Sequence, residues 1–138
     1  MQLYVYSAKV VGVYDGDTIT CDIDLGLDII IKDQKIRLQD INAPEIRGDQ
    51  RKRGLESRDW LRNRILGQQV IINTARDKKG KYGRYIATIF FEGENINLSM
   101  VKLGLARWYK NRHIKTTTER RKISIIEPNK TDKKENDS

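Results

Sequence analysis

The 138-residue chain has little of what several classes of protein require. Its one cysteine, Cys21, cannot form an internal disulfide, which excludes a disulfide-framed miniprotein. Its one histidine, His113, excludes zinc chemistry that depends on several histidine ligands. No apolar run approaches the roughly 20 residues of a membrane helix, and no basic segment leads into an apolar one at the start of the sequence. We therefore expect no membrane partner, no secretory signal and a cytoplasmic location.

Charged residues are abundant but unevenly distributed. The chain has 27 lysines and arginines against 19 aspartates and glutamates, a net charge of +8. Residues 1–46 hold four basic and eight acidic residues, and residues 47–138 hold 23 basic and 11 acidic ones. This separation suggests a carboxylate site facing a basic field, for which a polyanion such as DNA or RNA is the natural partner. The alternative is a solvated basic surface that binds nothing.

Alternating and β-branched segments predict five strands, at residues 3–14, 18–24, 28–39, 69–74 and 84–91. A helix is predicted over residues 54–66, with Gly67 as its C-terminal stop. A second helix is predicted to begin at Asn97 as its N-cap, and Trp108 and Tyr109 beyond it are expected to pack in the core. Five strands with a helix between the third and the fourth are typical of an OB-fold barrel. The predicted fold class is mainly β, with two or three helices.

The domain organisation follows from the composition. We expect residues 1–110 to form one OB-fold domain and, since no feature predicts a partner subunit, a monomer. Residues 111–126 form a C-terminal extension that could hold a short helix or a strand-like patch. Residues 127–138 are polar throughout and are expected to be a disordered tail.

Three short segments carry residues that can do chemistry. Residues 15–18 are Asp-Gly-Asp-Thr, residues 42–45 are Asn-Ala-Pro-Glu and follow Arg37, and residues 81–84 are Lys-Tyr-Gly-Arg. Taken singly, these could be a hairpin turn, a solvated loop acid and structural arginines. Taken together, in this order and at these separations, they resemble the staphylococcal-nuclease-like (thermonuclease) family. The resemblance runs from about Val10 to Trp108.

The resemblance implies a five-stranded Greek-key OB barrel and a calcium-dependent endonuclease acting on DNA and RNA. Such an enzyme would cut the bond to the 5′ oxygen and leave 3′-phosphate ends. The positions that match the family's functional residues are Asp17, Asn42 and Ala43 for the metal, Glu45 as general base, Arg37 and Arg84 for the phosphate, and Tyr82, beside Lys81, near the bound nucleotide.

The chemistry gives a reason for these residue types. When water attacks phosphorus, negative charge grows on the phosphate oxygens. Arginine forks such as those of Arg37 and Arg84 match phosphate oxygens in pairs. A carboxylate such as that of Glu45 can take the proton of the water, and a hard cation held by oxygen ligands offsets the new charge.

Asn42 departs from the family pattern, which has aspartate at this position. Asparagine keeps one carbonyl oxygen but loses a charge, so calcium should bind more weakly, and Mg²⁺ and Mn²⁺ become alternatives. Asp15 lies two residues before Asp17, so in a regular strand the two side chains point to the same side. Asp15 is therefore the best candidate to supply the missing negative charge near the metal without binding it directly. Asp22 and Asp24 should face away from it.

A second function remains open at the level of the sequence. A non-catalytic OB-fold module would bind single-stranded nucleic acid or a protein partner without cutting anything. The retained Asp17, Arg37, Glu45 and Arg84 argue against it, whereas the missing charge at Asn42 keeps it open.

Overall fold

The computed structural model describes residues 4–79 and 83–109. The predicted extension at 111–126 and the tail at 127–138 lie outside the described residues, as do Lys81 and Tyr82. The division of the chain at residues 110 and 126 therefore stays a prediction. In the described ranges, no helix is both long and apolar enough to cross a membrane.

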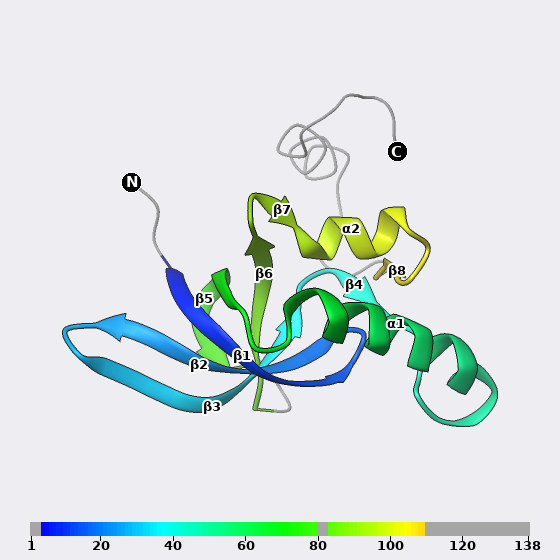
Figure 1. Cartoon of the computed structure of the whole chain (residues 1–138), viewed down its shortest axis with the longest axis horizontal. Coiled ribbons are helices and arrows are strands. Elements are labelled where there is room, and N and C mark those ends of the chain that lie inside the picture. The colour runs from blue at the N-terminus through cyan, green and yellow to red at the C-terminus, as the bar shows by residue number, and fades with distance from the viewer. Residues whose placement is uncertain (1–3, 80–82, 110–138) are drawn as a thin grey trace. The chain divides into compact units, whose positions relative to one another are not determined.

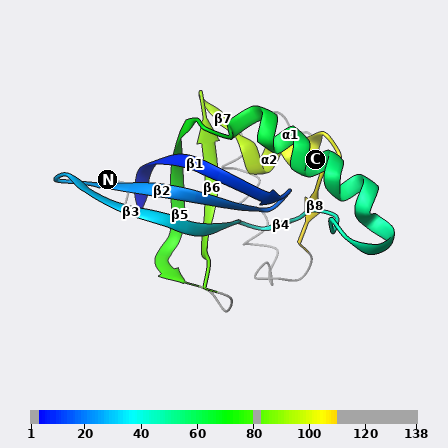
Figure 2. The ribbon, with the colours of Figure 1, turned by 60° about the horizontal axis from the view of Figure 1, so that its bottom comes forward.

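Five strands close into a barrel. They are β1 (Val5–Asp15), β2 (Thr18–Gly26), β3 (Ile29–Leu38), β5 (Gln69–Lys79) and β6 (Tyr85–Phe91). Their order in the sheet is β3-β2-β1-β5-β6, and β7 (Glu94–Asn95) adds a short edge to β6. The barrel closes where Ile36–Leu38 of β3 pairs in parallel with Tyr85–Ala87 of β6. This closed, mainly β barrel confirms the predicted OB fold (Figures 1 and 2).

The strands form because their sequences alternate between buried and exposed side chains. In β2, Ile19, Cys21 and Ile23 point into the barrel and are buried, whereas Asp24 at the end of this run is exposed. A register shift between Val10 and Gly12 of β1 marks an irregularity in its ladder with β2. The inward residues of all five strands, together with Leu61 and Ile65 of the first helix, make one hydrophobic core.

Helix α1 (Arg51–Ile65), after the short 3₁₀ turn η1 (Gly48–Gln50), starts three residues before the predicted position. Its buried residues are Gly54, Ser57, Leu61 and Ile65, whereas Leu66, just after its last residue, is exposed. The small residues Gly54 and Ser57 let the helix approach its neighbours closely. Ser57 Oγ donates a hydrogen bond to the carbonyl oxygen of Leu105 at 2.5 Å, which ties α1 to the chain after the second helix.

The predicted N-cap of the second helix, Asn97, is wrong. Helix α2 (Ile96–Lys102) is capped by Asn95, whose side-chain oxygen accepts a hydrogen bond from Leu98 N at 3.0 Å. Asn97 is buried inside the helix instead. Its amide accepts from Ile89 N at 3.1 Å and donates to the carbonyl oxygens of Gln39 and Ala87 at 3.1 and 3.2 Å. Asn97 thus binds backbone groups of β6 and of Gln39 just after β3, and this role replaces capping.

A two-residue ladder joins β4 (Ile41–Asn42) to β8 (Arg107–Trp108), with Ile41 opposite Trp108 and Asn42 opposite Arg107. The expectation that Trp108 and Tyr109 pack in the core is wrong, because their side chains are 41% and 49% exposed. Within the described residues β8 pairs only with β4, and Ile41 is the residue of this ladder that enters the core. This ladder places Arg107 beside Asn42.

Candidate active site

The turn between β1 and β2 positions two carboxylates. Asp15 pairs with Thr18 across the turn, and Asp15 Oδ1 accepts a hydrogen bond from Asp17 N at 3.1 Å. Gly16 lies between them, against Ala43 and Ser57. A β-carbon at Gly16 would lie 2.7 Å from Ala43 Cβ and 2.9 Å from Ser57 Cβ, so only glycine lets the turn pack this closely.

Asp17 links three segments of the chain and is only 8% exposed. Its Oδ2 accepts a hydrogen bond from Ala43 N at 2.8 Å and lies 3.6 Å from Arg37 Nη2. Its Oδ1 accepts from Thr18 Oγ1 at 3.2 Å, and its carbonyl oxygen accepts from Leu38 N at 2.8 Å. The carboxylate is therefore fixed against the loop that follows β4.

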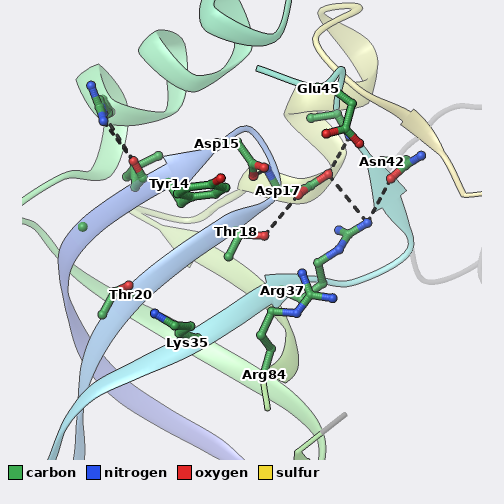
Figure 3. A pocket seen from close by; sticks show the side chains of 14 residues that line it. Tyr14, Asp15, Asp17, Thr18, Thr20, Lys35, Arg37, Asn42, Glu45 and Arg84 are labelled. Carbon is green, nitrogen blue, oxygen red and sulfur yellow. Dashed lines mark hydrogen bonds and ion pairs between the residues drawn. The ribbon is translucent and has the colours of Figure 1, made fainter. Parts of the chain in front are cut away.

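Arg37 is held by the end of β3 and by β4. Its Nη1 donates to the carbonyl oxygens of Leu38 and Ile41 at 2.9 and 2.8 Å, and its Nη2 donates to Asn42 Oδ1 at 3.1 Å. Because these contacts fix the plane of the guanidinium, Arg37 is preorganised beside Asp17 and Asn42 (Figure 3).

Glu45 is anchored through its backbone on both sides. Its N–H donates to Gln50 Oε1 at 3.1 Å, and its carbonyl oxygen packs so closely on Gly54 that a β-carbon there would overlap it. Figure 3 shows the Glu45 carboxylate pointing toward Asp17. The sequence around residue 45 thus folds into a fixed loop that directs one free carboxylate into the site.

These side chains share one hollow of about 720 Å³. The sequence-predicted residues that line it are Asp15, Asp17, Arg37, Asn42, Ala43, Glu45 and Arg84. Lys81 and Tyr82 lie outside the described residues. Asp22 and Asp24 do not line the hollow, as expected, and accept hydrogen bonds from Asp33 N and Gly26 N near the far end of the hairpin.

The sequence interpretation missed several lining residues. Lys35 and Arg37 alternate along β3 and therefore share a face, where they pair with Thr20 and Thr18 of β2. The period of two along a strand could have found this set. Arg62 of α1 also lines the hollow, where its Nε and Nη2 donate to the carbonyl oxygen of Val13 at 3.3 and 3.2 Å. Its place depends on how α1 packs on β1, which no local pattern reveals.

Two neighbouring carboxylates give the hollow its electrostatic character. Burial, reinforced by the nearby charge of Asp17, raises the pKa of Asp15 from 3.8 to about 6. Either a proton or a cation would relieve this repulsion. The described residues contain no group of three or more His, Cys, Asp or Glu side chains suited to a metal. A cation would need the oxygens of Asp17, Asn42 and Ala43 together, and this mixed oxygen set fits a hard divalent ion such as calcium.

Comparison with known proteins identifies the family of the chain. Residues 35–136 match the family model described as staphylococcal nuclease homologue. The chain belongs to the staphylococcal nuclease family. An uncharacterized endonuclease of Haemophilus influenzae is 36% identical over 104 residues, which cover 75% of this chain and 53% of that relative.

Two further proteins are similar to this chain. The thermonuclease of Staphylococcus hyicus is 31% identical over 102 residues, covering 72% of this chain and 57% of the relative. An uncharacterized protein of Methanocaldococcus jannaschii is 30% identical over 129 residues, covering 75% and 59%. The chain therefore spans little more than half the length of these curated relatives.

Proposed function

We propose that this member of the staphylococcal nuclease family is a metal-dependent endonuclease that hydrolyses phosphodiester bonds of DNA and RNA. The observation that carries the proposal is the hollow itself, which Glu45, Arg37 and Arg84 line together with the oxygen donors Asp17 and Asn42. Two relatives are named endonuclease and thermonuclease, which supports the same activity.

The two arginines would bind the phosphate. Arg37 and Arg84 both line the hollow, one from β3 and one from the residue before β6. A phosphate with negative charge growing on its oxygens matches their planar forks, and Arg37 is already held in place by three acceptors. The arginines therefore orient the phosphorus and stabilise the transition state more than the ground state.

Glu45 would activate the attacking water. Its carboxylate takes a proton from water while the water oxygen bonds to phosphorus and the bond from phosphorus to the 5′ oxygen breaks. The leaving oxygen takes a proton from solvent, so the products are a 3′-phosphate and a 5′-hydroxyl. The anchors at Gln50 and Gly54 keep the base in position without using its side chain.

Asp17, Asn42 and Ala43 would hold the divalent cation, with Asp15 beside them. When bound, the cation offsets the charge that develops on the phosphate oxygens. The ligand set carries less charge with Asn42 than with an aspartate, so we propose calcium with weakened affinity, and Mg²⁺ or Mn²⁺ as the alternatives.

One observation favours a non-catalytic binding module. The neutral Asn42 amide accepts a hydrogen bond from Arg37, and Arg37 also donates hydrogen bonds to two backbone carbonyl oxygens. A site built in this way could hold a phosphate without cutting it.

A cleavage time course separates the two functions. Single-stranded DNA, duplex DNA and RNA are incubated with calcium, magnesium, manganese or a chelator, using the wild-type and Glu45→Gln proteins. Metal-dependent cutting that the variant loses supports the nuclease, and the active ion identifies the metal. Binding without cutting under every condition overturns it in favour of the binding module.

A further inference from the structure

A second hollow, of about 360 Å³, adjoins the candidate active site. The two hollows share Asn42, Ala43 and Glu45, so the loop that carries the proposed base forms a wall of both. The rest of the second hollow includes Arg53 of α1 and Arg107 of β8. A strand of nucleic acid leaving the first hollow across this wall would enter the second.

Both arginines are attached to the parts of the fold that position the site. Arg107 is opposite Asn42 in the β4–β8 ladder, and directly paired residues present their side chains on the same face. Arg53 immediately precedes Gly54, whose backbone is in close contact with the Glu45 carbonyl oxygen. The backbone positions of both residues are therefore set relative to Glu45.

The electrostatics of the second hollow differ from those of the first. Arg53 and Arg107 are exposed and, among the residues that the structure describes, neither has a hydrogen bond or ion pair from its side chain. By contrast, Arg37 and Arg62 of the first hollow are each held by acceptors. Glu45 is the one carboxylate that this described lining contains. Two guanidinium groups against one carboxylate leave this described lining with a net positive charge.

We propose that the second hollow is a subsite for the phosphodiester next to the scissile one, bound by Arg53 and Arg107. The inference rests on the proposed function, because it assigns the second hollow to the same nucleic acid strand. It makes the preferred substrate a strand that continues past the cleaved bond, so that two successive phosphates are bound on either side of the Glu45 loop.

The first test measures binding apart from cleavage. In the Glu45→Gln protein, the affinity for a single-stranded oligonucleotide is measured against salt concentration. Each phosphate contact on a single strand contributes about 0.7 to the slope of log affinity against log salt. The added change Arg53→Gln/Arg107→Gln should reduce the slope by about 0.7, whereas Lys9→Gln/Lys102→Gln removes the same charge elsewhere and should leave it nearly unchanged. Equal effects of both pairs would overturn the subsite.

The second test uses substrate length. Substrates with one cleavable phosphodiester are compared with the same substrates extended by one nucleotide on the 5′ or the 3′ side. In the wild type, one of the two extensions should raise kcat/KM about tenfold. The Arg53→Gln/Arg107→Gln protein should show no such gain, and it should cleave the unextended substrate as fast as the wild type does. Equal losses on both substrates would overturn the subsite and leave the nuclease standing.

The two proposals fail separately. If the wild type cuts no substrate, the proposed function is wrong, and the salt dependence still tests whether Arg53 and Arg107 bind a strand. Thermal melting of each variant checks that it folds. The single variants Arg53→Gln and Arg107→Gln should each lose part of the salt-dependent slope and part of the gain from the longer substrate.

Discussion

The two ends of the β2–β3 ribbon are built from the same pair of strands but differ in what covers them. At one end, Asp17 and Thr18 are buried beside Arg37, and the loop after β4 and α1 both pack on the turn at Gly16. At the other end, residues 25–31 extend beyond the barrel on the side away from α1 (Figures 1 and 2), and Leu27 is 93% exposed. Strand pairing alone therefore does not make a site. The covering loop and helix are also needed, because they hold the side chains in place and bury Asp17.

The turns at these two ends also differ. The site turn contains Gly16, because the chain there must approach Ala43 and Ser57 closely. The far turn contains Leu27 and Asp28, both in the left-handed region with φ of 56° and 63°. A leucine in this conformation is strained. The Leu27 side chain is almost fully exposed, so packing against the described residues does not offset this strain. Substitutions at the two ends should therefore have different consequences.

The largest effect is expected at the covered end. Gly54→Ala places a methyl group on the Glu45 carbonyl, so the loop or α1 must move. We expect a loss of about 1–3 kcal/mol in the free energy of unfolding, together with a large loss of cleavage because Glu45 is displaced. Urea denaturation and cleavage assays measure the two effects. Unchanged stability and activity would show that Glu45 is not held by this contact.

Asn42→Asp should strengthen the metal site. It adds a charged oxygen ligand beside Asp17, and we expect calcium affinity to rise about tenfold, because ligand charge is one of its determinants. A calcium titration by calorimetry measures this. The same titration on Asp22→Asn, at the ribbon but away from the hollow, should match the wild type. No change in Asn42→Asp would show that residue 42 does not face the cation.

Cys21, between the two ends of the ribbon, should weaken the fold in alkali. Burial, with a smaller contribution from Asp22, raises the pKa of its thiol from 9.0 to about 12. Above pH 9 the unfolded chain releases a proton that the folded chain retains, so stability should fall by up to about 1.4 kcal/mol per pH unit. Cys21→Ala should lack this part of the pH dependence. Parallel curves for the two proteins between pH 9 and 10 would contradict the burial of the thiol.

The smallest effect is expected at the far turn. Leu27→Asn places a residue that tolerates the left-handed conformation at an exposed position, so stability should rise by about 0.5–1 kcal/mol with no change in cleavage. Thermal melting and a cleavage assay measure both quantities. A loss of activity would show that the far end of the ribbon takes part in function.

The barrel could be predicted from local patterns, because alternation revealed the strands. The residues that line the hollow, among them Asp17, Arg37 and Glu45, were instead predicted through the resemblance to the nuclease family, because each short motif alone could be a turn or a solvated loop. The errors came where tertiary contacts decide. Asn97 looks like a cap, but its amide is needed by strands far away in the sequence. Gly54 and Ser57 are not apolar, so hydrophobic spacing could not show that α1 buries them.

The most direct test of the account is the single-turnover cleavage rate of Glu45→Gln, with binding of the same oligonucleotide measured in parallel. Glu56→Gln, an exposed position on α1, is the matched control. We expect Glu45→Gln to lower the rate by about 100-fold or more while binding is retained, and Glu56→Gln to behave as the wild type. A Glu45→Gln protein that cleaves at the wild-type rate would contradict the assignment of Glu45 as the base that activates water.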